Sequence, residues 1–167
     1  NYSTEELQKA IKTLQKAPHY AHEKYMETAL QVLEKHPKGA ENLAVPTWFY
    51  GHEPSNLFAS HIAKYFSNSI REDTLIAISL YGIVFSPGSA GTTQEIFQDA
   101  TQNHYVTFDK VSPMVFLGIN RYKEETMIYP CIEQLSADRE YGKLLLCTDE
   151  VEEIVQFIKD HPPYVPE

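Results

Sequence analysis

The 167-residue sequence is poor in cysteine and basic residues, and it has no long apolar run. Its two cysteines, Cys131 and Cys147, have no second pair and no histidine at zinc-finger spacing, which predicts core thiols in a reducing cytosol rather than a disulfide or metal site. Lys and Arg number 14 against 23 Asp and Glu, a net charge of −9 that argues against nucleic acid as a partner. No apolar run approaches the roughly 20 residues that span a bilayer, and no signal segment opens the chain, so we expect a soluble, cytoplasmic protein without membrane partners.

Strand and helix patterns alternate along the chain. Apolar runs of strand length lie at residues 43–45, 82–85, 113–118 and 144–147. Helices are expected at about 3–17, 25–36, 55–70, 92–103, 130–140 and from 148 onward. Ser3 and Glu6 have the pattern of a capping box at the start of the first helix. The alternation predicts an α/β fold, a Rossmann-like doubly wound parallel sheet with helices on both faces. Four strands are fewer than the roughly five or six of such sheets, so we expect one incomplete domain over residues 1–167.

The segment from Gly82 to Glu95 joins a strand to a helix through a turn that contains glycine. Backbone N–H groups at a helix start point outward together, and that end of the helix carries roughly half a positive charge. Gly88 and Gly91 have no Cβ to block an approaching anion. The pattern predicts a site for a nucleotide phosphate, formed by Gly88, Ser89, Ala90, Gly91 and Thr92.

The same segment resembles the Pro-Gly-Gly-x-Gly-Thr-x-x-Glu motif of the Lonely Guy (LOG) family, nucleoside 5'-monophosphate phosphoribohydrolases often labelled lysine decarboxylases. Residues 87–95 depart from the motif only at Ser89, where the family has glycine. The family carries an arginine on the preceding helix, and Arg71 fills that place, although Glu72 stands where lysine is usual. Residues 48–54 and 96–100 are similar to the larger bacterial branch, and the resemblance covers most of the chain.

The resemblance implies a hydrolase that cleaves the N-glycosidic bond of nucleoside 5'-monophosphates to give free base and ribose 5-phosphate, without cofactor or metal. It also implies a homodimer, for which the broad apolar stripe expected on the 55–70 helix offers a surface. Members of the family carry a Gly-Gly-Gly-x-Gly segment upstream. This chain has no glycine before Gly39, so we expect it to be the C-terminal part of a longer protein.

Glu95 and Arg71 are the predicted catalytic residues. Cleavage of an N-glycosidic bond develops positive charge on the ribose, which a carboxylate stabilises. Glu95 lies three residues after Thr92 and reaches back toward the turn, while Arg71 would orient Glu95 or contact the substrate. Two structural alternatives stay open. Residues 92–95 also have the pattern of a capping box, and Arg71 near a helix end is favoured by the helix dipole.

An aromatic stretch follows the strand at residues 43–45, at the sheet edge where parallel sheets bind ligands. Trp48, Tyr50 and His52 are therefore candidate base-binding residues, with coverage of a sheet edge or dimer seam as an equal alternative. The competing function is a non-catalytic nucleotide-binding or sensor module. Such a module keeps the phosphate turn but does not need Glu95 or Arg71.

Overall fold

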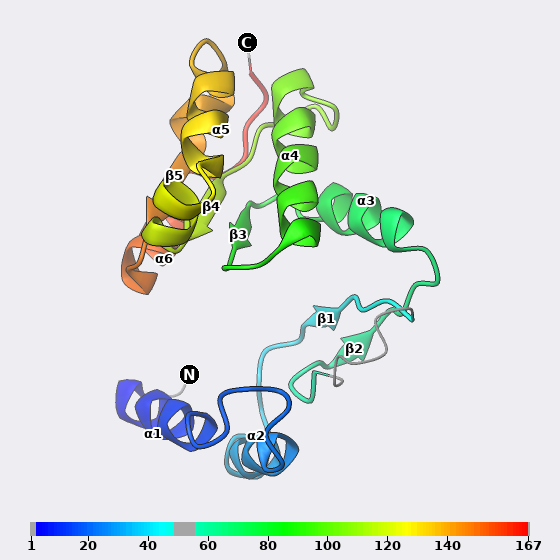
Figure 1. Cartoon of the computed structure of the whole chain (residues 1–167), viewed down its shortest axis with the longest axis vertical. Helices are drawn as coiled ribbons and strands as arrows, with labels where there is room; N and C mark the ends of the chain where they lie inside the picture. The colour runs from blue at the N-terminus through cyan, green and yellow to red at the C-terminus, as the bar shows by residue number, and fades with distance from the viewer. Residues whose placement is uncertain (1–2, 49–55, 167) are drawn as a thin grey trace. The chain divides into compact units, whose positions relative to one another are not determined.

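The computed structural model describes residues 3–48 and 56–166, and the chain divides into two compact units, residues 1–71 and 72–167 (Figure 1). The first unit contains α1 (Thr4–Leu14), α2 (Tyr25–Lys35), β1 (Leu43–Ala44), β2 (His61–Ile62) and the first turn of α3 (Asn68–Ile78). The second contains the rest of α3, β3 (Ile83–Phe85), α4 (Ala90–Tyr105), β4 (Met114–Leu117), η1 (Asn120–Glu125), α5 (Ile128–Ser136), η2 (Glu140–Leu144), β5 (Leu145–Thr148) and α6 (Val151–Asp160). The predicted α/β class is confirmed. The single domain and the doubly wound order stay predictions.

The first unit begins with the predicted helical pair. Ser3 caps α1, because the Glu6 N–H donates to Ser3 Oγ (3.3 Å) and the Ser3 N–H donates to Glu6 Oε2 (2.8 Å). This is the predicted capping box. Helices α1 and α2 pack against each other, and α2 buries Ala29 and Val32.

The helix predicted at residues 55–70 is wrong over residues 56–67, and only residues 68–70 are helical, at the start of α3. Strand β2 lies there and pairs in parallel with β1, with Leu43 opposite His61, and α3 begins only at Asn68. Phe66 and Ile70, expected on a buried stripe, are 71% and 59% exposed. Strand pairing with a distant segment overrides the helical spacing of these apolar residues. The argument for a homodimer from that stripe therefore falls, and the homodimer rests on the family resemblance alone.

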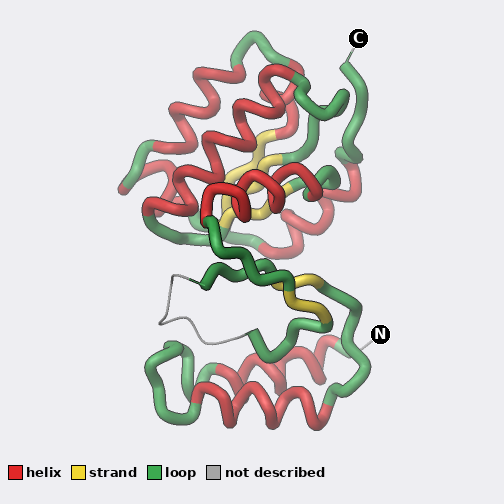
Figure 2. The backbone as a smooth tube through the Cα atoms, turned by 90° about the vertical axis from the view of Figure 1, so that its right-hand side faces the viewer, coloured by secondary structure: helices red, strands yellow, loops and turns green. Residues whose placement is uncertain are grey.

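The second unit contains a three-stranded parallel sheet in the order β3-β4-β5. Ile83 pairs with Met114, and Met114 pairs with Leu145, so consecutive strands are neighbours joined by α4 and by η1 with α5. Met114, Val115 and Phe116 of the central strand have no exposed surface, as predicted for a strand covered on both faces. Figure 2 shows the strands of this unit among its helices.

Two further expectations concern cysteine and membranes. Both cysteines are free, but Cys131 is exposed, so the prediction of a core thiol is wrong for this residue; it lies on the outer side of α5. Cys147 on β5 is half-buried, and burial raises the pKa of its thiol.

No helix within residues 3–48 and 56–166 has both the length and the apolar character that crossing a bilayer requires.

Candidate functional site

The predicted strand, turn and helix of the phosphate segment are confirmed. Strand β3 ends at Phe85, Ser89 is the N-cap residue of α4, and the helix begins at Ala90, two residues earlier than predicted. The Ser89 carbonyl accepts the first intrahelical hydrogen bond, from the Thr93 N–H (3.1 Å). The five predicted phosphate residues, 88–92, therefore lie immediately before and within the first turn of α4.

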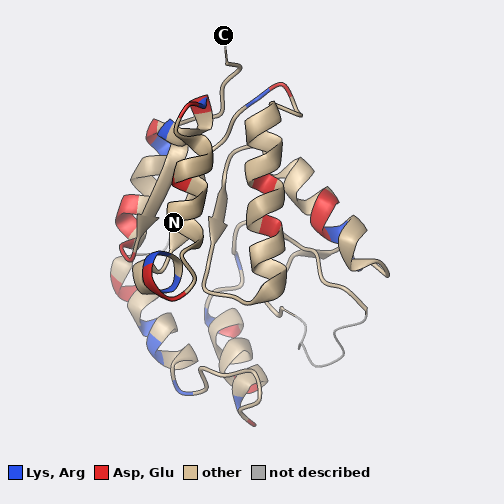
Figure 3. Ribbon diagram, turned by 45° about the horizontal axis from the view of Figure 1, so that its top comes forward, with Lys and Arg blue, Asp and Glu red and all other residues tan. Residues whose placement is uncertain are grey.

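The start of α4 is not closed by the helix's own side chains. The Ser89 side chain makes no capping hydrogen bond, and the first turn carries no acidic residue. The two acidic residues of α4 are Glu95 and Asp99, both further along the helix (Figure 3). The first amides of the helix, at residues 90–92, have no intrahelical acceptor, and together with the dipole they favour an anion.

The capping-box alternative for residues 92–95 is wrong. With Ser89 at the N-cap, Thr92 is the third helical residue, and Glu95 is the sixth. A capping box needs its first residue at the N-cap and its carboxylate three residues later. Helix capping therefore does not explain Glu95.

One cleft joins the turn to Glu95. Its volume is about 360 Å³, within the range of ligand pockets. Thr92 and Glu95 of α4 line it together with Ser86 and the residues of β3, and α3 contributes Ile76 among others. The structure therefore brings together the predicted carboxylate, part of the predicted phosphate turn and the carboxyl end of a parallel strand.

The two glycines of the turn have different surroundings. A Cβ on Gly88 would overlap Thr92 Oγ1 and lie 2.8 Å from Thr92 Cβ, so the packing of Thr92 on the turn requires glycine. A Cβ on Gly91 would meet only Glu72 Oε1, at an ordinary contact distance of 3.8 Å. Protein packing therefore explains Gly88, whereas at Gly91 it leaves room for a side chain or for a ligand atom.

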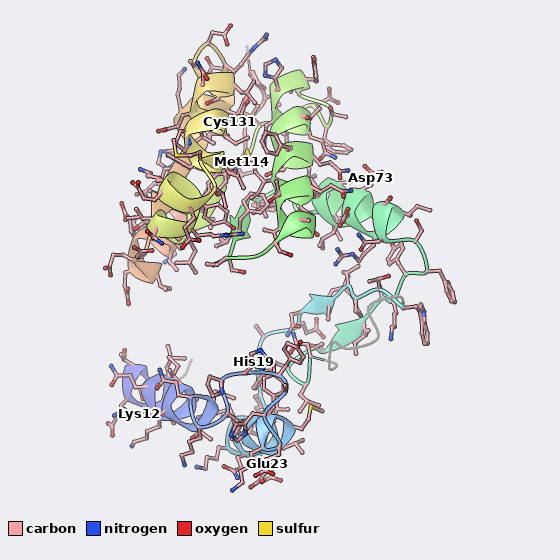
Figure 4. All side chains as sticks on the ribbon, viewed as in Figure 1. Lys12, His19, Glu23, Asp73, Met114 and Cys131 are labelled. Atoms are coloured by element: carbon pink, nitrogen blue, oxygen red, sulfur yellow. The ribbon has the colours of Figure 1, made fainter. Side chains whose placement is uncertain are left out.

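Glu72, the departure from the family's lysine, lies beside this turn. It has no exposed surface, and its carboxylate approaches Gly91 from α3. A carboxylate here complements the dipole of α4, but it also repels a bound phosphate, which a lysine would attract. Neighbouring Asp73 on α3 accepts a hydrogen bond from Gln98 Nε2 of α4 (2.7 Å), which joins the two helices (Figure 4).

Arg71 lies in the first turn of α3, at the opposite end of a helix from the C-terminal end predicted for it. The dipole disfavours a cation in a first turn, so the proposed dipole explanation for Arg71 is wrong. Arg71 Nη1 donates to the Val45 carbonyl (3.4 Å) in the first unit. Arg71 belongs to the first unit and Glu95 to the second, so a joint role of the two stays a prediction.

The candidate base-binding residues are described only at Trp48, because Tyr50 and His52 lie outside the described residues. Trp48 is 52% exposed and stacks on Phe66, with 5.7 Å between ring centres. The Lys64 ammonium lies 4.1 Å from the centre of the Trp48 ring. Both neighbours occupy ring surface that a base would need, and base binding by Trp48 stays a prediction.

Two residues at the turn were missed by sequence reasoning. Arg121 Nη2 donates to the Gly88 carbonyl (2.6 Å), and the Tyr122 hydroxyl donates to the Ser86 carbonyl (2.6 Å). Both residues lie on η1, which follows β4. The available signal was their position after the carboxyl end of a buried strand, where parallel sheets place ligand-binding loops.

Asp99 is a second carboxylate of α4, in a different environment. It is 4% exposed, and burial raises its pKa to about 7. Asn103 Nδ2 donates to Asp99 Oδ1 (3.2 Å), and the Ser112 N–H donates to Asn103 Oδ1 (2.8 Å), which ties α4 to the segment before β4. Asp99 and Lys110 line a small cavity of about 10 Å³, which shares Ile76 and Ser79 with the Glu95 cleft.

An apolar cleft of about 310 Å³ in the first unit is a poorer site. It lies between α1 and α2, and its described lining includes Ile11, Leu14, Tyr25 and Phe58 but no acidic or basic side chain. Over the described ranges 3–48 and 56–166, no three His, Cys, Asp or Glu residues gather as metal ligands would. The Glu95 cleft is therefore the candidate site.

A comparison of the chain with models of known protein families and with curated proteins finds no match.

Proposed function

We propose that the protein hydrolyses the N-glycosidic bond of nucleoside 5'-monophosphates to give a free base and ribose 5-phosphate. The observation that carries the proposal is the single cleft that Thr92 of the turn and Glu95 of the following helical turn line together. A phosphate and its ribose are adjacent in the substrate, so one helix start can bind the first while a carboxylate one turn later faces the second. The resemblance of residues 87–95 to the LOG motif supplies the reaction.

The chemistry assigns each group a role. Water adds to C1' of the ribose as the bond to the base breaks, and the base leaves with that electron pair and takes up a proton. Positive charge develops on the sugar, and the Glu95 carboxylate stabilises it. The turn amides bind the phosphate, and Arg71 orients Glu95 or contacts the substrate. No metal or cofactor is part of the proposal.

The proposal also includes five further residues, the cellular location and the assembly state. Glu72 lowers the affinity for phosphate relative to the family's lysine, whereas Ser89 can add a hydroxyl donor. Trp48, Tyr50 and His52 remain candidates for stacking on the base. We place the protein in the cytoplasm as a homodimer on the resemblance, and light scattering at micromolar concentration tests the dimer.

Chromatographic assay of base release from AMP, GMP, CMP and UMP tests the reaction. We expect at least one nucleotide to yield its base together with an equal amount of ribose 5-phosphate, at a rate that EDTA does not change. Binding of nucleotides without any base release would instead support a nucleotide-binding or sensor module.

A further inference from the structure

The segment that follows β4 contacts the chain at three points where it enters the phosphate turn, at Ser86, Pro87 and Gly88. Arg121 and Tyr122 donate to the carbonyls of Gly88 and Ser86, both at 2.6 Å. Gly118 has φ +121°, and a Cβ there would lie 3.1 Å from Pro87 Cγ. These contacts join positions more than thirty residues apart, so they are tertiary and not part of the turn's local geometry.

The segment is itself held in place. Residues 120–125 form a π-helical turn, a rare conformation that is frequent at functional sites. Tyr122 is 1% exposed and packs edge-on against Phe116 of the central strand, with 5.2 Å between ring centres. The Ile119 N–H donates to Asp149 Oδ1 (2.9 Å). Arg121 therefore projects from a fixed base.

The Arg121 side chain divides its donors between two acceptors. Nη2 donates to the Gly88 carbonyl, and Nη1 forms an ion pair with Glu125 Oε2 (3.2 Å). A guanidinium holds its donors in one plane, so the Glu125 contact orients the group that reaches Gly88. The side chain is 33% exposed, which leaves its charge partly screened by water.

Peptide geometry turns this contact into an effect on the anion site. The Gly88 carbonyl and the Ser89 N–H belong to one planar trans peptide and point in opposite directions. A carbonyl held by Arg121 therefore directs the Ser89 N–H away from η1. Glycine at position 88 permits many backbone conformations, so without this hydrogen bond the peptide can rotate and present its carbonyl oxygen to the anion.

We infer that Arg121 is a positioning residue for the phosphate turn, and that its hydrogen bond to Gly88 aims the Ser89 amide at the substrate phosphate. The inference rests on the proposed function, because it concerns the phosphate of that same site. Arg121 acts through Gly88 and Ser89 and takes no part in breaking the glycosidic bond.

Titration of ribose 5-phosphate into ¹⁵N-labelled protein, followed at the amides of residues 89–91, tests the inference. Arg121→Ala should weaken binding about tenfold, the typical effect of losing one hydrogen bond from a charged donor, and should shift the Ser89 resonance before any ligand is added. Arg121→Lys should restore part of the affinity. Lys123→Ala is the matched control, since it removes a cation of η1 whose ammonium lies over the Tyr129 ring, 4.7 Å from its centre.

The outcomes separate this inference from the proposed reaction. Loss of affinity in Arg121→Ala, with amide resonances distant from the turn unchanged, supports the inference even if no nucleotide is hydrolysed. An unchanged Ser89 resonance and affinity in Arg121→Ala, or an equal loss in Lys123→Ala, overturns it even if base release is intact. A wild-type protein whose turn amides do not respond to ribose 5-phosphate overturns both.

Discussion

Helices α1 and α4 both have serine at the N-cap, yet their starts are built in opposite ways. Ser3 and Glu6 form a reciprocal capping box, with Glu5 adding a second acid in the first turn of α1. Hydrogen bonds from the backbone N–H and hydroxyl of Ser3 lower the pKa of Glu6, which keeps its carboxylate charged. Ser89 makes no capping bond, and the first turn of α4 has no acid.

The difference separates a helix start that serves the fold from one that is available to a ligand. In α1 the Glu6 N–H donates to Ser3 Oγ and the Ser3 N–H donates to Glu6 Oε2, so side chains of the chain itself cap this helix start. The Ser89 side chain makes no such bond in α4, which contributes Ile96 and Ala100 to the core, so the stability of this helix comes mainly from packing. A well-packed helix whose own N-cap side chain makes no capping bond can bind an anion at its start without unfolding.

The largest expected effect is a loss of turnover when the Glu95 carboxylate of α4 is neutralised, with no loss when the Glu6 carboxylate of α1 is neutralised. Glu95→Gln should retain ribose 5-phosphate binding and lower turnover by about two to four orders of magnitude, because it removes the charge that stabilises the sugar cation. Steady-state assays of base release measure the effect. Glu6→Gln, its counterpart in α1, should leave turnover unchanged. A decrease of less than about tenfold in Glu95→Gln would remove Glu95 from the chemistry.

The two helices also differ in the residues that they bury, since α1 has no buried residue whereas α4 buries Asp99. The pKa of Asp99 rises from 3.8 to about 7 on folding, so the folded state binds more protons than the unfolded state between these values. The stability of the wild type should therefore fall as pH rises from about 4 through about 7, by on the order of 4 kcal/mol, and change no further from this group above about pH 8.

Asp99→Asn tests that dependence by chemical denaturation at a series of pH values. The stability gained by the variant over the wild type should increase between pH 4 and 7. Lys110 is the other titratable residue in the described lining of the Asp99 cavity, so Lys110→Met separates its contribution. Asp109→Asn is the matched control, because Asp109 is exposed and its φ of 56° suits asparagine. An equal gain in stability by Asp109→Asn between pH 4 and 7 would contradict the assignment of the pH dependence to Asp99.

The two glycines of the turn should respond differently to substitution by alanine. Gly91→Ala should raise stability by up to about 1 kcal/mol, since alanine is the better helix former and its Cβ finds ordinary contact with Glu72. The same methyl group should weaken ribose 5-phosphate binding about tenfold or more by blocking approach to the backbone. Calorimetric titration and thermal unfolding measure the two effects.

Gly88→Ala provides the opposite pattern as a control. Its methyl group would overlap Thr92, so stability should fall by about 1 to 3 kcal/mol, the usual effect of overpacking. If Gly91→Ala leaves affinity unchanged, the phosphate does not approach the first turn at Gly91.

The sequence predicted the elements whose signals are local. The Ser3–Glu6 capping box, the strand-turn-helix of residues 82–105 and the buried strand at Met114–Phe116 are confirmed, because capping chemistry, glycine and continuous apolar runs act over a few residues. The helix predicted across residues 55–70 is wrong over residues 56–67, because the pairing of β2 with β1 depends on residues eighteen positions away. Strand pairing at that distance leaves no local pattern.

The sequence predicted the turn and the carboxylate of the candidate site, but not the side chains from other segments that contact the turn. The LOG-like motif located residues 88–92 and Glu95, and the cleft brings Thr92 and Glu95 together. Arg121 and Tyr122 were missed because their hydrogen bonds to the turn span 33 and 36 positions. The burial of Glu72 was missed because a charged residue is normally expected at the surface.

The smallest expected effects compare the two serines directly. Ser3→Ala should cost about 1 kcal/mol of stability, measured by hydrogen exchange in α1, because it removes the hydroxyl that accepts from the Glu6 N–H. Ser89→Ala should change stability by less than about 0.5 kcal/mol, because its hydroxyl makes no capping bond. Equal losses in the two variants would show that Ser89 caps α4 in solution, and the start of α4 would then be closed by its own chain like that of α1.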